Sequence, residues 1–221
     1  TSHSIYPSFP FNKIIIFITQ ILLLVTFIAA WEICANANII DPFITSKPSR
    51  ILDTFMNLSQ NGLLEHIGVT CFETIIGFLS GTILGIIVAI ILWWSNFLSK
   101  VAEPFLVVLN SLPKVALGPV IIIWVGAGMP AIIVMALSIS LIVTILEILN
   151  GFLSTDKEKI KMAKTFGANK FQILTKIVIP ANISTFINSL KVNIGLSLVG
   201  VISGEFLVSK AGLGYLIVYG G

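Results

Sequence analysis

Charged residues are scarce in this chain. Asp, Glu, Lys and Arg make up only 10% of its 221 residues, whereas a soluble globular domain carries about 25%. Hydrophobic residues make up 56%, and the mean hydropathy is +1.03. The composition therefore excludes an ordinary soluble domain and indicates that lipid is the solvent for most of the chain.

Cysteine is also rare, and a common nucleotide-binding motif is missing. Cys34 and Cys71 lie in or near apolar segments without CxxC spacing, so the sequence supports neither a metal site nor a disulfide framework. We interpret both as packing residues. No GxxxxGK[ST] phosphate-binding loop is present, so any chemistry of ATP and Mg²⁺ must belong to another chain. We expect no cofactor in this chain and no nucleic-acid partner.

Long apolar segments are what the sequence has in abundance. A hydrocarbon layer about 30 Å thick needs about 20 apolar residues of helix. Such segments cover approximately residues 14–34, 68–94, 101–125, 130–152 and 177–207. We therefore expect an all-α, polytopic membrane helix bundle that forms a single transmembrane domain over residues 1–221. Residues 46–64 carry apolar side chains at helical spacing, which predicts an amphipathic helix on the bilayer or against the bundle.

Two of the expected spans contain residues that affect helix packing. In the second span a glycine recurs at every fourth position from Gly77 to Gly85, which lets another helix approach closely. Pro104, Pro113 and Pro119 interrupt the third span, which must therefore be bent or divided. A broken helix at membrane depth needs protein or a water-filled cavity around it. These prolines therefore serve either packing or the lining of a pathway.

The most informative polar segment is residues 154–176. Thr155 and Glu158 have the spacing of a capping box, which predicts a helix start. Gly167 is expected to end this helix, and a second short helix is expected from about Asn169.

This segment is also the most basic part of the chain. It holds six of the 13 Lys and Arg residues: Lys157, Lys159, Lys161, Lys164, Lys170 and Lys176. The positive-inside rule therefore places the segment in the cytoplasm. Counting the spans backward puts the amino terminus in the cytoplasm and residues 36–66 outside.

A helix, a glycine and a second helix between two spans resemble the loop of one permease family. Permeases of binding-protein-dependent ABC importers carry EAA, three residues, Gly, about nine residues, Ile, two residues and Pro. This chain has Lys161, Met162, Ala163, Gly167, Ile177 and Pro180 at the corresponding positions. Lys161 and Met162 depart from the family's Glu and first Ala. Further similarities are Pro113, Ala116, Pro119, Trp124 and Gly126 in the third span, and Glu205 with Gly212, Leu213 and Gly214 near the end.

The resemblance implies the fold, function and partners of such a permease. The chain would be the transmembrane subunit of an ATP-driven importer for a small polar solute, in the lipid bilayer of a bacterial cell membrane. Its partners would be ABC ATPase subunits, an extracytoplasmic substrate-binding protein and a second permease copy. The pattern is most similar to the branch that serves aliphatic sulfonates, taurine, nitrate and thiamine-precursor pyrimidines. The loop residues implied to couple to the ATPase are Ile160, Lys161, Met162, Ala163, Phe166, Gly167 and Phe171.

Several residues are candidates for the translocation path. Lys191 lies near the middle of the fifth span, where an ionisable group is costly and is therefore a functional candidate. It would line the route or pair with an acid such as Glu73 or Glu147. Glu205 would support a gate or the docking of a binding protein. The full set of path candidates is Lys191, Glu73, Glu205, Pro113 and Pro119.

Two other readings of the function remain open from the sequence. The chain could be a secondary transporter or channel driven by an ion gradient, although no inverted repeat is visible. It could be a non-transporting membrane scaffold, with residues 154–176 as an ordinary solvated loop. The family would place a last span after Gly214, where only a short segment remains, so we expect that span to be truncated.

Overall fold

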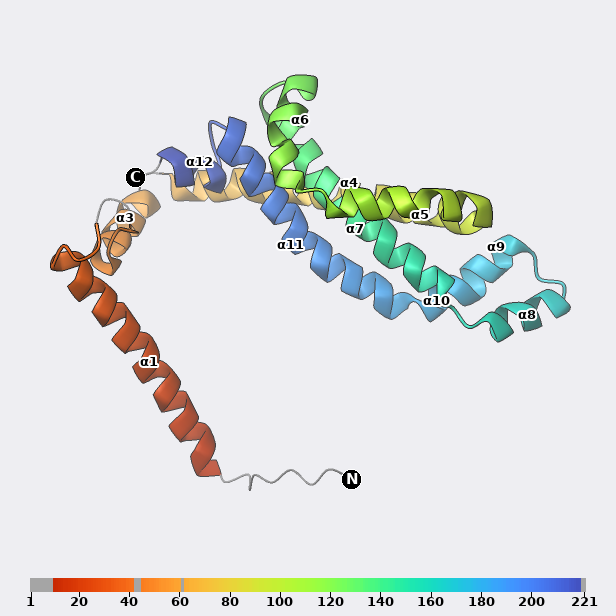
Figure 1. The fold of residues 1–221 in the computed structure, drawn as a ribbon, viewed down its shortest axis with the longest axis horizontal. Coiled ribbons are helices and arrows are strands. Elements are labelled where there is room, and N and C mark those ends of the chain that lie inside the picture. The colour runs from red at the N-terminus through yellow and green to blue at the C-terminus, as the bar shows by residue number, and fades with distance from the viewer. Residues whose placement is uncertain (1–9, 42–44, 61, 220–221) are drawn as a thin grey trace. The chain divides into compact units, whose positions relative to one another are not determined.

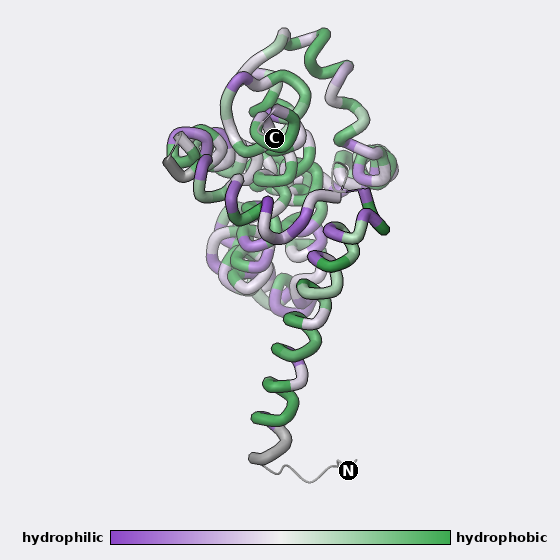
Figure 2. The backbone as a smooth tube through the Cα atoms, turned by 90° about the vertical axis from the view of Figure 1, so that its left-hand side faces the viewer, coloured by the Kyte–Doolittle hydropathy of each residue, from purple (hydrophilic) through white to green (hydrophobic). Residues whose placement is uncertain are grey.

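The computed structural model describes residues 10–41, 45–60 and 62–219 (Figure 1). The described part of the chain contains helices joined by turns and short connections, without β-strands, and falls into two compact units, residues 1–63 and 64–221. Hydrophobic residues, drawn in green, cover most of the helical backbone (Figure 2). Among the described residues, four helices are long and apolar enough to cross a membrane, and the number rises to five if a bent helix pair forms one span. The predicted all-α, multi-pass architecture is confirmed.

The first unit contains α1 (Pro10–Asn36) and α3 (Pro48–Gln60). Pro48 is the first residue of α3, a position where the missing N–H of proline costs nothing. The end of α1 is joined to the start of α3, because the Glu32 carboxylate accepts hydrogen bonds from the Ser49 N–H at 3.0 Å and the Ser49 hydroxyl at 2.9 Å. The helix expected within residues 46–64 is α3.

Three long helices form the second unit: α4 (Leu63–Trp94), α7 (Met129–Leu153) and α11 (Ile183–Val208). Their contacts depend on glycine. A Cβ on Gly77 would lie 2.8 Å from the Ala136 side chain, and one on Gly200 would lie 2.6 Å from the Ala136 backbone. The glycines let α4 and α11 approach α7 from two directions, as the spacing of the glycines in α4 predicts.

The third apolar region is broken, as its prolines predict. It consists of α5 (Asn96–Ser111), the 3₁₀ turn η1 (Lys114–Leu117) and α6 (Gly118–Val125). The two halves meet at 87°. Pro113 directly precedes the 3₁₀ turn, and a proline cannot continue the preceding helix because it lacks an N–H. Pro104, by contrast, lies inside α5 and does not divide it.

The remaining elements connect α7 to α11 and follow α11. They are α8 (Lys157–Thr165), α9 (Lys170–Ile173), the π-helical turn η2 (Leu174–Val178), α10 (Ile179–Ala181) and α12 (Leu213–Tyr219). The last long helix begins at Ile183, later than the expected start near residue 177. The reason is a break at Asn182, whose φ of −110° and ψ of 16° depart from helical values. Residues 170–181 therefore continue from the polar loop rather than from the span.

Candidate coupling loop and translocation path

Short-range hydrogen bonds define the first helix of the loop. Asp156 is the N-cap of α8, and its carboxylate accepts a hydrogen bond from the Glu158 N–H at 2.8 Å. The capping box expected from Thr155 and Glu158 is therefore wrong. Thr155 is buried, and its hydroxyl oxygen accepts a hydrogen bond from the Asn182 amide at 2.8 Å. Because Thr155 is used in this contact, the next residue caps the helix.

Gly167 ends α8 as predicted. Its φ of +77° is a conformation that glycine adopts without steric cost, and the Ala168 N–H closes the helix end by donating to the Ala163 carbonyl at 3.0 Å. Asn169 then starts α9. Its side chain accepts from the Gln172 N–H at 2.8 Å, while the Gln172 side chain accepts from the Asn169 N–H at 2.9 Å. The reversal between α8 and α9 is thus fixed by local interactions.

The predicted coupling residues divide between two faces of the loop. Ile160 and Ala163 are half-buried and pack against a core cluster that includes Phe152 and Ile173. They therefore hold the loop against the ends of the long helices.

The outward face is apolar and uncovered. Met162, Phe166 and Phe171 have exposed fractions of 58%, 83% and 63%. Large apolar side chains at such exposure on a short polar loop are unfavourable in water and mark a contact surface. Of the coupling set, these are the apolar side chains that are available to a partner.

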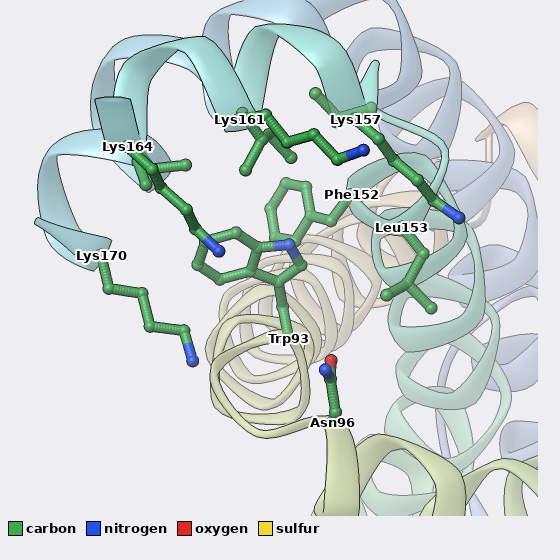
Figure 3. Close-up of a pocket in the computed structure, with 11 residues that line it drawn as sticks. Trp93, Asn96, Phe152, Leu153, Lys157, Lys161, Lys164 and Lys170 are labelled. Carbon is green, nitrogen blue, oxygen red and sulfur yellow. The ribbon is translucent and has the colours of Figure 1, made fainter. Parts of the chain in front are cut away.

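A cavity of about 390 Å³ lies on the inner side of the loop. Its lining combines aromatic and aliphatic side chains with four lysines, Lys157, Lys161, Lys164 and Lys170. Figure 3 shows the lysines extending from α8 and the start of α9 around Trp93 and Phe152. Lys161, which stands where the family has glutamate, is therefore part of a basic cavity wall.

At the other end of α4, buried polar groups hold the segment after α11 in place. Glu205 is only 1% exposed. Its carboxylate accepts hydrogen bonds from the Thr70 hydroxyl at 2.6 Å and from the Gly214 N–H at 2.7 Å. The Leu213 N–H donates to the Thr70 oxygen at 2.8 Å, and the Gly212 N–H donates to His66 Nδ1 at 2.9 Å. We call these residues the polar corner.

The polar corner gives Glu205 and Glu73 a location that the sequence alone does not reveal. Glu73 is buried, and its carboxyl lies beside that of Glu205. The sequence provides a signal for Glu205, because it precedes the Gly212 to Gly214 segment. It provides none for Thr70, whose role depends on contacts between residues far apart in the chain.

Lys191 lies apart from both glutamates. It is exposed on α11, about 20 Å along the helix from Glu205. The exposed residues Ser184, Asn188 and Gly195 share its face at helical spacing. This polar stripe on a helix long and apolar enough to span a membrane faces neither α4 nor α7 and is costly in lipid.

The two prolines of the path set lie in different surroundings. Pro113 is exposed at the bend between α5 and η1. Pro119 lines a cavity of about 360 Å³ that also includes Ser203 and Phe206 of α11. The structure thus brings Glu73 and Glu205 together and places Lys191 apart from them. In the part of the chain that the structure describes, no three His, Cys, Asp or Glu side chains could hold a metal ion.

Comparison with known proteins identifies a family. The family described as "Binding-protein-dependent transport system inner membrane component" matches residues 81–221, more than half of the chain. A Haemophilus influenzae protein named "probable ABC transporter permease protein" is 29% identical over 189 residues, covering 86% of this chain and 77% of the relative. The formylaminopyrimidine transport permease ThiX of Halalkalibacterium halodurans is 25% identical, covering 84% and 74%. The riboflavin permease RibX of Chloroflexus aurantiacus is 28% identical, covering 90% and 74%.

Proposed function

Because the chain belongs to the family of inner membrane components of binding-protein-dependent transport systems, we propose that its 154–176 loop receives the ATPase subunit. The observation that carries this proposal is the outward apolar face of the loop, formed by Met162, Phe166 and Phe171. A partner that covers these side chains removes apolar surface from water and gains binding free energy. Ile160 and Ala163 then transmit the movement to the core cluster against which they pack.

Membership of the family confirms several predictions from the sequence. The chain is a multi-pass inner membrane permease of an ABC transport system, and it works with an ATPase and a binding protein. ATP is hydrolysed in the partner, and this chain needs no cofactor. A secondary transporter driven by an ion gradient and a non-transporting scaffold are thereby set aside.

We propose that the loop lies on the cytoplasmic side of the membrane. Six lysines within residues 154–176 support this orientation through the positive-inside rule. The amino terminus then also lies in the cytoplasm, although residues 1–9 are outside the described part of the chain. The polar corner lies at the extracytoplasmic end, where a binding protein delivers solute.

We further propose that a second copy of this chain completes the translocation path. The support is the polar stripe of α11, which includes Asn188 and Lys191 and is exposed in the single chain. Facing a second stripe across a hydrated route would remove these groups from lipid. Glu73 and Glu205 then shape the gate rather than contact the solute. Glu205 can do so because it accepts a hydrogen bond from the Gly214 N–H at the start of α12.

The transported solute is proposed to be small and polar. The relatives are named for a formylaminopyrimidine and for riboflavin, so permeases of similar sequence serve different solutes. A pyrimidine fits the branch that the sequence resembles. Lys191 would attract an anionic or electron-rich group on the solute.

The ATPase-docking proposal is tested by Phe166→Ala. We expect the amount of ATPase that co-purifies with the permease to fall about tenfold, which corresponds to the loss of one buried aromatic side chain. The matched control is Phe72→Ala, because Phe72 is 57% exposed on α4 away from the loop. Co-purification unchanged by Phe166→Ala, or reduced equally by both substitutions, would contradict the proposal.

A further inference from the structure

A basic cavity lies between the loop and the ends of α4 and α7. Docking of an ATPase on the outward face of the loop would not involve the residues that line this cavity. Four of its eleven lining residues are lysines, and none is acidic. Lys157, Lys161 and Lys164 are exposed and occupy one face of α8. Met162 and Phe166 belong to the opposite face. The cavity lining is therefore basic, and no acidic residue in it pairs with the lysines.

The fourth lysine is held in a fixed position. The Lys170 ammonium donates a hydrogen bond to the Trp94 carbonyl and lies 5.6 Å from the centroid of the Trp94 ring, within the range of a cation–π contact. This arrangement ties the start of α9 to the end of α4. It leaves the three lysines of α8 as the cations available to a ligand.

The other wall of the cavity is apolar. Trp93, Phe152, Leu153, Ile160 and Ile173 line it. Trp93 stands at the end of a helix long and apolar enough to cross a membrane, and tryptophan is enriched at the level of the lipid headgroups. The cavity thus offers cations and an apolar surface together at the membrane boundary.

We propose that this cavity binds the phosphate headgroup of an anionic phospholipid, with the lysines of α8 around the phosphate and the adjoining chain against Trp93 and Leu153. The volume of about 390 Å³ falls within the range of small-molecule sites. Basic pockets at the cytoplasmic ends of membrane helices suit such headgroups. A free phosphate ion would use the lysines but not the apolar wall. The inference rests on the cytoplasmic orientation proposed above.

The bound lipid would support the loop from its inner side while the ATPase covers its outer side. Binding of an anionic headgroup would explain why this chain has a lysine at position 161. An acidic segment of a partner protein is the competing occupant. A protein segment is less favoured as the occupant because the lysines line the cavity at the ends of α4 and α7. The exposed apolar face of the loop, where a protein partner would dock, lies on the other side of α8.

The test is a titration of the purified, delipidated full-length chain in neutral detergent, followed by native mass spectrometry. The probes are dioctanoyl phosphatidylglycerol, dioctanoyl phosphatidylcholine and inorganic phosphate. We expect phosphatidylglycerol to bind at least tenfold more tightly than phosphatidylcholine, and inorganic phosphate at equal concentration not to displace it.

The decisive variant replaces Lys157, Lys161 and Lys164 by Gln. We expect it to bind phosphatidylglycerol about 100-fold more weakly, because each lysine contributes to attraction of an anionic headgroup. The control with the same charge change replaces Lys100, Lys159 and Lys176 by Gln. None of these lysines lines the cavity, so this variant should change the affinity for phosphatidylglycerol by about threefold or less. Lys161→Gln alone should give an intermediate loss, so the series remains informative if the triple variant folds poorly.

Four outcomes would overturn the proposal. They are equal binding of the two lipids, retention of phosphatidylglycerol by the cavity variant, equal loss in the control, and displacement by inorganic phosphate, which would identify a phosphate-ion site. Loss of ATPase co-purification in the cavity variant with unchanged lipid binding would instead identify an acidic protein partner. The Phe166→Ala experiment reports on ATPase docking independently, because Phe166 does not line the cavity. Failure of one proposal is thus distinguishable from failure of the other.

Discussion

The two ends of α4 differ in whether the groups around them find partners within the chain. At the polar corner, the buried Glu205 carboxylate is hydrogen-bonded to Thr70 and to the Gly214 N–H. At the loop end, apolar side chains such as Phe166 remain exposed, and lysines line a cavity without an acidic residue. One end finds its partners within the chain, whereas the other presents groups for partners outside it. The polar corner should therefore contribute to stability, and the loop surface to association.

The largest expected effect is at the polar corner. Glu205→Ala leaves the buried Gly214 N–H without its acceptor and leaves the Thr70 hydroxyl with only the more distant His66 carbonyl, at 3.2 Å, so we expect the free energy of unfolding to fall by about 3 kcal/mol. Denaturant unfolding of the purified chain in detergent measures this loss. Glu205→Gln keeps the size and one acceptor oxygen, and should lose about half as much. Equal stability of the Ala variant and the unaltered chain would show that the corner does not stabilise the fold.

A smaller effect is expected where the loop joins α11. The buried Asn182 amide donates to the Thr155 hydroxyl oxygen at 2.8 Å and to the Val178 carbonyl at 2.8 Å. Asn182→Ala should lower the free energy of unfolding by about 1 to 2 kcal/mol. It should also speed proteolytic cleavage within residues 154–176, because this contact ties the start of the loop to its end.

The control for this prediction is Asn188→Ala. Asn188 is exposed on α11, and surface substitutions usually change stability by no more than about 0.5 kcal/mol. If both variants were cleaved at the same rate, the side-chain contacts of Asn182 would not restrain the loop.

The sequence predicts the helices better than it predicts their polar contacts. Long apolar runs and glycines at every fourth position depend on local composition, so the membrane helices and the packing of α4 on α7 at Gly77 follow from them. Gly167 and Asn169 also act locally, and both perform the predicted role in the loop. By contrast, Thr155 is used by Asn182, a contact between residues far apart in the chain that no local capping pattern reveals.

In the candidate site, too, local sequence patterns do not predict the tertiary contacts. The sequence indicates the apolar residues of the loop as a group, but helical spacing alone does not say which side of α8 the bundle covers. Packing against Phe152 and Ile173 decides that Ile160 and Ala163 face inward. The sequence predicts that Glu205 supports a gate or the docking of a binding protein. Its hydrogen bonds to Thr70 and to the start of α12 depend on the tertiary arrangement and give it a structural role that the sequence does not predict.

The smallest expected effect is on the stability of the isolated chain when its outward face is altered. Met162 is 58% exposed, so Met162→Ser should change the free energy of unfolding by no more than about 0.5 kcal/mol. Ile160→Ser on the same helix is the matched comparison, because Ile160 is half-buried against the core cluster. That substitution should cost about 1 to 2 kcal/mol, measured by the same denaturant unfolding. A large loss from Met162→Ser would place this side chain in the folded core, and α8 would then have no separate apolar face for a partner to cover.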